Sequence, residues 1–338
     1  MVVDHDVRIL TPDDYPLWDE LATESPQGTI FHSSTWLRTY ASLISKKEIL
    51  YGYFKDENLA GGCSVFSDKK NHMLSAAEST GRMTPYGGYI LSRSESSKVR
   101  ENERTCATII RTINNEMVKR FDTISIINSP GFSDIRPFIW NNWNASVFYA
   151  YFFNVEGIIE EKISKKVWWA VRKAQKSGIS VKRENEPDLY YQLFQKTFEK
   201  HHMPPPVSKN FLNQMIEMIL ANNMGEMWIA RTPTGQPAAA EIVIWDNKCA
   251  HRWSAASDPQ FKDMGATSLL LFEIFQDLQK KNFTKINLMA ANTPSLTKYI
   301  SSFNPELTPY YGIEIRNFKY KMLKIPVSVG NMIMGSIF

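Results

Sequence analysis

The same order of predicted elements occurs twice along this chain, and the repetition limits the folds that it can adopt. In the first half, the β-forming runs ILYGYFK and LAGGCSVF flank the polar residues DEN, which is typical of a hairpin. In the second half, EMWIAR and PAAAEIVIW flank TPTGQ in the same way. A helix and a further β run follow each hairpin. We therefore predict a mixed α/β (α+β) fold of two tandem units, each a mixed sheet flanked by helices.

The helix after each hairpin has apolar residues at helical spacing. The first is predicted over about 101–119, before DTISII, and the second over about 266–280, before KINLMAA. Helices are also predicted ahead of the hairpins, from SSTWLRTYASLI, DLYYQLFQKTFEKH and KNFLNQMIEMIL. At 338 residues the chain has room for two domains, at roughly 150 residues each. We expect them over 1–155 and 156–338.

The composition narrows the function classes. The net charge of +4 is too small to indicate a DNA-binding protein by itself. Cys63, Cys106 and Cys249 lack CxxC or Cys/His spacing, so we expect neither disulfides nor a bound metal. The start, MVVDHDVRIL, has no secretory pattern, and a cytoplasmic protein fits best. The basic and then apolar tail, FKYKMLKIPVSVGNMIMGSIF, leaves two alternatives open: peripheral membrane contact, or closure onto the protein's own core.

The segment KISKKVWWAVRKAQKSG has six basic residues, two tryptophans and no acid. Ser164 can cap a helix over 164–177, and Gly178 can end it. One side of this helix is apolar. The other carries a stripe of cations and indole that could bind phosphates and cover a base or sugar. The stripe consists of Lys165, Lys166, Trp169, Arg172, Lys173 and Lys176. The alternative is a solvated helix face without a ligand.

The segment DPQFKDMGATSLLLFEIF predicts a glycine turn at the start of a helix. Free backbone N–H groups and the helix dipole make such a junction an anion site, and Gly265 would allow close approach. Equally, Gly265 could be a turn glycine, with Thr267 or Ser268 capping the helix.

Glu241 is the candidate general base. Strand alternation places it on one face with Ala239, Val243 and Trp245, and desolvation on such a face makes a carboxylate a better acceptor of an amine proton. The alternative is a solvent-facing glutamate on an edge strand. Further acid/base or ligand candidates, or else partly exposed structural histidines, are His201, His202 and the pair His251–Arg252.

TPYGGYI predicts a tight turn that presents the phenol of Tyr86. The phenol could donate a hydrogen bond to a substrate, or it could only fill the turn.

Taken together and in order, several segments resemble the FemAB-like branch of the GNAT acyltransferase superfamily. They are GTIFHSSTWLRTY, TPYGGYI, ISKKVWWAVRKAQKSGISV, AASDPQFKDMGATSLLLFEIF and LMAANTPSLTKYISSFNPELTPYYGIE. The resemblance implies tandem GNAT domains. It also implies transfer either of an acyl group from coenzyme A to an amine, or of an aminoacyl group from charged tRNA to a peptidoglycan precursor. Both donors are rich in phosphate.

Carried across by position, the family's basic helix falls on Lys165, Arg172 and Lys173. Its F-H-x-x-x-W motif falls on Phe31, His32 and Trp36, and its glycine turn on Gly265.

Two positions depart from the family pattern. Asp263 stands where the coenzyme A loop, Gln260 to Gly265 here, has its inner glycine. Ile300 stands where F-K-x-x-F has its lysine, with Lys298 two residues away.

The sequence thus predicts an N-acyltransferase, for example an acetyltransferase, that uses acyl-CoA. Its acceptor would be the amine of a small molecule, a sugar or a nucleotide-linked cell-envelope precursor. Glu241 would accept the proton, and the acceptor would contact His32, Trp36, Tyr86, Arg252 and Lys298. The donor would contact Lys165, Trp169, Arg172, Lys173, Lys176, Gln260, Gly265 and Ala266. Two alternatives stay open: an aminoacyl-tRNA-dependent transferase acting on a cell-wall precursor, and a non-catalytic module that binds an anionic ligand.

Overall fold

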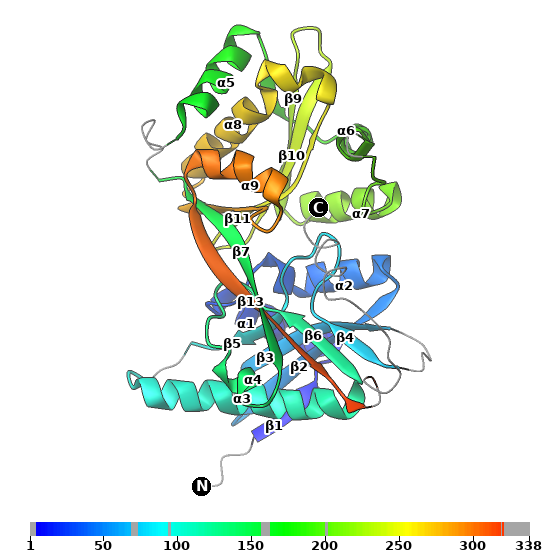
Figure 1. The fold of residues 1–338 in the computed structure, drawn as a ribbon. Helices are drawn as coiled ribbons and strands as arrows, with labels where there is room; N and C mark the ends of the chain where they lie inside the picture. Colours follow the sequence, from blue (N-terminus) through cyan, green and yellow to red (C-terminus); the bar gives the residue numbers. More distant parts are fainter. Residues whose placement is uncertain are drawn as a thin grey trace. The chain divides into compact units, whose positions relative to one another are not determined.

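The computed structural model describes residues 5–68, 74–93, 96–156, 163–199, 202–318 and 320 (Figure 1). The chain forms two compact units, and each has the mixed α/β architecture expected from the sequence. The first contains the described residues up to Phe148 and those from Pro309 onward, and the second runs from Tyr149 to Thr308. The sequence-based division placed everything after residue 155 in the second domain. In the structure, the last strand, β13 (Glu306–Arg316), instead pairs with β6 (Thr123–Ile127) of the first unit.

The first unit is a sheet with helices against it. Its strand order is β1-β2-β3-β4-β6-β13, and β5 pairs with β3 off this path. The further strands are β1 (His5–Ile9), β2 (Lys46–Lys55), β3 (Asn58–Asp68), β4 (Ala76–Glu78) and β5 (Gly88–Leu91). The helices are α1 (Tyr15–Glu24), α2 (Ser34–Leu43), α3 (Val99–Arg120) and α4 (Arg136–Ile139), with short 3-10 turns at Pro12–Asp14 and Ile30–His32.

The predicted hairpin and helix of this unit are confirmed. β2 and β3 pair antiparallel from Lys46↔Asp68 to Lys55↔Asn58. The periodic apolar residues of α3 are buried in one core with Ile124 and Ile126 of β6, as a 3.6-residue period requires. These α3 residues are Ile109, Ile110, Ile113 and Met117.

The second unit repeats the plan with strand order β7-β12-β11-β10-β9-β8. Its strands are β7 (Asn144–Asn154), β8 (Ser180–Arg183), β9 (Gly225–Arg231), β10 (Pro237–Trp245), β11 (Ala250–Ser257) and β12 (Lys285–Met289). Its helices are α5 (Lys165–Lys176), α6 (Pro187–Glu199), α7 (Lys209–Ala221), α8 (Ala266–Lys280) and α9 (Pro294–Ile300), with 3-10 turns η4 (Pro259–Met264) and η5 (Ser301–Phe303). The predicted hairpin is β9–β10, and the helix predicted over 266–280 is α8.

The core of the second unit lies between the sheet and the helices α5 and α8, which run beside each other in Figure 1. Leu270, Leu271, Ile274 and Phe275 of α8 are almost fully buried there. Each such side chain contributes about 1.5–3 kcal/mol on burial, so the apolar stripe of α8 holds the helix against the sheet.

The parallel ladder between β11 and β12 is very short. It contains only the pairs Ala250↔Ile286 and His251↔Asn287. Beyond His251, β11 continues to Ser257 beside β10 alone, with a bulge that leaves Trp253 without a partner in the β10 register. Strand β11 therefore leaves its parallel neighbour at Arg252, in the middle of the sheet.

Among the described residues, no helix combines the length and the hydropathy needed to cross a bilayer. The apolar tail that suggested membrane contact lies outside the described residues, except for Phe318 and Tyr320.

Candidate functional site

The predicted basic helix exists and has the expected ends. The Ser164 side chain accepts a hydrogen bond from the backbone N–H of Val167, and Gly178 adopts φ +71° just after the helix. Val167, Val171 and Ala174 are buried against the core of the second unit. This apolar side fixes the helix, and the opposite side faces outward.

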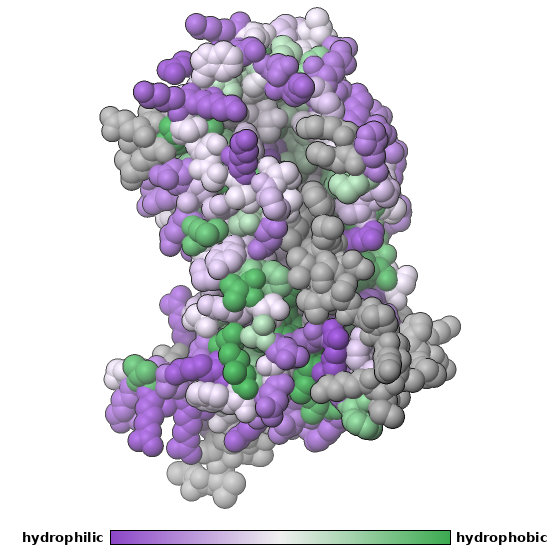
Figure 2. All heavy atoms as spheres, in the orientation of Figure 1, coloured by the Kyte–Doolittle hydropathy of each residue, from purple (hydrophilic) through white to green (hydrophobic). Residues whose placement is uncertain are grey.

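The outward side of α5 is cationic and is called the α5 cationic face below. Its members are Lys165, Lys166, Trp169, Arg172, Lys173 and Lys176; all are exposed except the half-buried Lys173. Trp169 is 62% exposed, and the Lys173 ammonium lies 5.2 Å from the centroid of its ring. No ion pair joins these cations to any acid in the described part of the chain. Figure 2 shows a largely hydrophilic surface over this helix.

Gly265 directly precedes α8 and packs against α5. It has φ +76°, and a Cβ placed on it would lie 2.2 Å from the carbonyl oxygen of Ala170 in α5. The close approach that the sequence suggested at this glycine is therefore made by the protein's own backbone. Its effect is to hold the first turn of α8 against the middle of α5.

The other residues named at this junction differ in their exposure. Gln260 is exposed, and its backbone N–H donates to the Asp258 carboxylate over 3.0 Å. Ala266 is buried as the first residue of α8, and Asp263 is exposed on η4.

Glu241 lies in the sheet as a buried partner of Arg252. Arg252 donates from Nε to Oε2 over 2.8 Å and from Nη2 to Oε1 over 2.6 Å, and the Glu241 side chain is 1% exposed. Burial lowers the pKa of Arg252, but the charge and hydrogen bonds of Glu241 raise it by more, so the guanidinium stays protonated. The guanidinium therefore occupies both carboxylate oxygens. This pairing removes the property on which the predicted general-base role of Glu241 rested.

Two hydroxyl groups accompany the ion pair. The Tyr299 phenol of α9 lies 3.4 Å from the Ser268 hydroxyl of α8. Burial raises the pKa of Tyr299 to about 12, although the Arg252 charge and the hydrogen bond with Ser268 act in the opposite direction. Tyr299 is therefore a neutral hydrogen-bonding group at physiological pH.

A third hydroxyl lies close by on α6. Tyr190 is fully buried and hydrogen-bonds the Ser254 hydroxyl over 2.7 Å, and burial raises its pKa well above the usual value. The charges of Glu241 and Arg252 act on this phenol as well.

Sequence reasoning found Glu241 and Arg252 separately but missed Tyr190, Ser254 and Tyr299 as members of one polar group. These residues could have been found in the sequence as polar residues within otherwise apolar helical stripes and strands.

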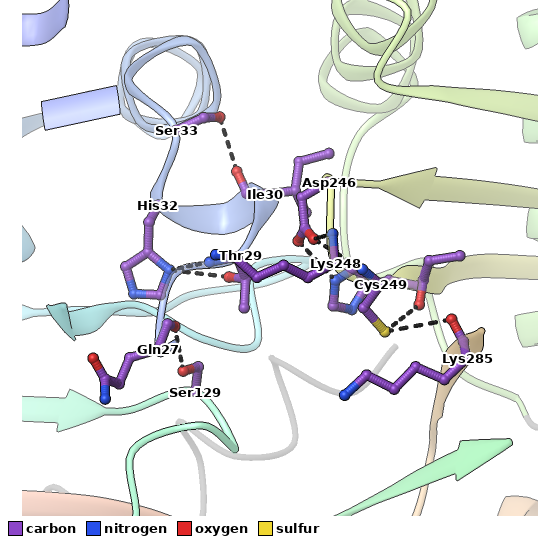
Figure 3. A network of polar contacts seen from close by, with 12 residues as sticks. Gln27, Thr29, Ile30, His32, Ser33, Ser129, Asp246, Lys248, Cys249 and Lys285 are labelled. Carbon is purple, nitrogen blue, oxygen red and sulfur yellow. Dashed lines mark hydrogen bonds and ion pairs between the residues drawn. The ribbon is translucent and has the colours of Figure 1, made fainter. Parts of the chain in front are cut away.

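His32, Trp36 and Tyr86 lie in the core of the first unit. The Trp36 ring packs edge-on against Phe31 at 5.0 Å, and Phe31 packs against Tyr86 at 5.8 Å. The Trp36 Nε1–H donates to Thr84 Oγ1, and the His32 Nδ1 contacts Thr29, toward which the ring points in Figure 3. Tyr86 is 1% exposed, so its turn buries the phenol instead of presenting it.

The remaining candidate residues differ in burial. His251 is buried, with Nε2 3.4 Å from Asp246, whose carboxylate also accepts the backbone N–H groups of Lys248 and Cys249 (Figure 3). Lys298 and His202 are exposed, and His201 lies outside the described residues. Among the described residues, no three or more His, Cys, Asp or Glu side chains gather as metal ligands.

The second unit matches the model of a known family. Residues 162–298 match the family model described as "Acetyltransferase (GNAT) domain", which covers the α5 cationic face, Gly265 and the Glu241–Arg252 pair. No significant match was found among curated proteins.

Solved structures agree over almost the whole chain. A structure of FemX has a TM-score of 0.70 at 10% identity and covers 95% of this chain and 100% of its own. The C-terminal domain of a putative lysylphosphatidylglycerol synthetase from Agrobacterium fabrum has a TM-score of 0.57 at 10% identity, with 92% and 94% covered. A tandem GNAT protein from the clavulanic acid biosynthesis pathway has a TM-score of 0.54 at 9% identity, with 93% and 98% covered. These comparisons confirm the tandem fold that the resemblance implied.

Proposed function

We propose that this chain is an N-acyltransferase that binds acyl-CoA on the α5 cationic face and transfers the acyl group to an amine. One observation carries the proposal: helix α5, whose cationic face has no acidic partner among the described residues, packs at Gly265 against the first turn of α8. Phosphates near that turn would meet both side-chain cations and the positive end of a helix dipole. The match to a GNAT acetyltransferase domain over the same residues supports this donor class.

The chemistry is a direct attack of the acceptor amine on the donor carbonyl, without a covalent enzyme intermediate. Positioning and hydrogen-bond donors would supply most of the rate, as in other acyl transfers. Because both oxygens of Glu241 are held by Arg252, the amine's proton would pass to water instead of to Glu241. The acceptor would be an uncharged or nucleotide-linked amine of a small molecule, sugar or cell-envelope precursor.

A second donor, aminoacyl-tRNA, is favoured by the length of the cationic face. From Lys165 to Lys176 the face spans roughly 16 Å at 1.5 Å per residue, which is more than one pyrophosphate requires. The exposed indole of Trp169 suits stacking on a base. The exposed Asp263, at the place of a coenzyme A-loop glycine, also weighs toward this donor because it would repel a pyrophosphate.

Calorimetric titration tests the proposal. Wild type would be titrated with coenzyme A, acetyl-CoA and a tRNA acceptor minihelix, and so would the triple variant K166E/R172E/K176E. The matched control is R100E/R104E/R111E, which reverses three cations on α3. We expect the α5 variant to lose at least about tenfold in affinity, since hydrogen bonds to charged groups contribute about 1.5–3 kcal/mol each. Equal behaviour of both triple variants, or no binding of any probe to wild type, would overturn the proposal.

A further inference from the structure

The guanidinium of Arg252 has one edge engaged and one edge available. Its Nε and one Nη2 hydrogen are used by Glu241. Among the described residues, none accepts a hydrogen bond from Nη1. The side chain as a whole is only 10% exposed, so it is not on the open surface. A guanidinium N–H that no protein group accepts can donate to a ligand oxygen.

The net charge of the Glu241–Arg252 pair decides whether a charged or an uncharged ligand oxygen binds better at the free edge of Arg252. Glu241 already neutralises Arg252, and both are desolvated together. A carboxylate or phosphate at the free edge would place two anions beside one cation in a poorly solvated position. An uncharged carbonyl oxygen can accept hydrogen bonds from the same N–H groups without that repulsion.

The backbone of Arg252 also lies where β11 separates from β12. Arg252 is the first residue of β11 beyond the last pair with β12, His251↔Asn287. Backbone groups of a strand that leaves its neighbour need other partners, and a ligand can supply them. Tyr299 and Ser268 add neutral hydroxyl groups beside the ion pair. Ser268 lies one helical turn after Gly265, so the first turn of α8 connects this group to helix α5, which carries the cationic face.

We propose that the free edge of Arg252 binds an uncharged carbonyl oxygen of the acyl group, and that Glu241 excludes acyl groups that end in a carboxylate. Glu241 is then a positioning and specificity residue that acts through Arg252. This inference rests on the proposed function for the identity of the ligand. The binding preference itself is a property of the pair and can be measured without a donor.

Arginine side-chain NMR tests the preference with two small probes. N-methylacetamide supplies a neutral carbonyl, and acetate supplies an anion of similar size; neither has a phosphate. The Arg252 guanidinium signals would be identified by their loss in Arg252→Lys or, if that variant does not fold, by their shift in Glu241→Asp. We expect saturable shifts with N-methylacetamide and at least about tenfold weaker binding of acetate.

The variant Glu241→Gln keeps the side-chain shape but removes the negative charge. We expect it to reverse the order, so that acetate binds more tightly than N-methylacetamide, because Arg252 then has an uncompensated charge. A merely structural Glu241 would not reverse a preference. Equal binding of both probes to wild type, no saturable shift, or an unchanged order in Glu241→Gln would overturn the inference.

The two proposals can fail separately. If neither coenzyme A nor the minihelix binds, the proposed function is wrong, but the NMR result on Arg252 remains valid. A failed NMR test would leave donor binding on α5 untouched.

Discussion

The carbonyl oxygen of Ala170 occupies the space in which a Cβ on residue 265 would lie, 2.2 Å from where that atom would stand. A glycine is therefore required at position 265 for two reasons. Its φ is +76°, and the backbone of α5 leaves no room for a Cβ. The contact ties the cationic helix to the helix that carries Ser268. Phosphate binding and acyl recognition, as proposed above, would depend on this one packing contact.

Replacing Gly265 by Ala should destabilise the protein by about 1–3 kcal/mol, or more if the helices cannot separate, because backbone strain and a backbone clash add together. Urea denaturation would measure the change. Gly235→Ala is the control, since Gly235 also has a positive φ, +83°, but no described residue beyond its chain neighbours comes within 4 Å of its would-be Cβ. A cost at Gly265 no larger than that at Gly235 would contradict the packing argument.

The Glu241–Arg252 pair should show strong coupling in a double-mutant cycle. Glu241→Leu or Arg252→Met alone should cost about 3–5 kcal/mol, because each leaves an uncompensated buried charge. The double variant should cost clearly less than the two single changes together. Denaturation of the four proteins at neutral pH gives the coupling energy, and simple additivity would show that the two charges do not depend on each other.

Asp258 should make stability depend on pH in the acid range. Burial raises the pKa of its carboxyl, but Lys196 at 2.5 Å and the backbone N–H of Gln260 lower it by more, so the folded pKa lies below 3.8. A depressed folded pKa adds stability above about pH 4, and this is lost as the pH falls through the folded value. Asp258→Asn should therefore cost about 1 kcal/mol at pH 7, since Lys196 is half exposed and screened, and the difference from wild type should shrink as the pH falls below about 4.

Denaturation of both proteins between pH 3 and pH 7 checks this dependence. Glu101→Gln serves as the comparison because its ion pair with Lys98 is on the surface and should change stability little. A constant difference between wild type and Asp258→Asn across the range would rule out the ionised Asp258 as its source.

Salt should distinguish the two donors. If a tRNA minihelix lies along α5, the logarithm of its binding constant should fall steeply with the logarithm of the salt concentration. K166E/R172E/K176E should flatten that slope by about 0.7–0.9 for each phosphate that the variant no longer neutralises. Coenzyme A, with few phosphates, should show a much weaker dependence. A minihelix slope that the α5 variant leaves unchanged would place tRNA elsewhere or exclude it.

The sequence determined the secondary structure and the repeated plan. Short-range patterns decide these features: the apolar period of α3 and α8, the polar turns of both hairpins, and the Ser164 cap with Gly178 at the ends of α5. They act within a few residues, so they can be seen in the sequence. The exposure of the α5 cationic face follows from the same periodicity, because burying its apolar side turns the cations outward.

Only the tertiary structure decided what the buried polar residues do. Glu241 and Arg252 lie eleven positions apart, and their pairing depends on the β10–β11 register and the bulge at Trp253. The turn at Tyr86 suggested a presented phenol, but contacts with Phe31 and the distant Tyr310 enclose it. Whether a carboxylate is a free base or half of an ion pair depends on neighbours brought together across strands and helices. Local sequence carries no information about those neighbours, because burial and pairing arise from the packing of the whole unit.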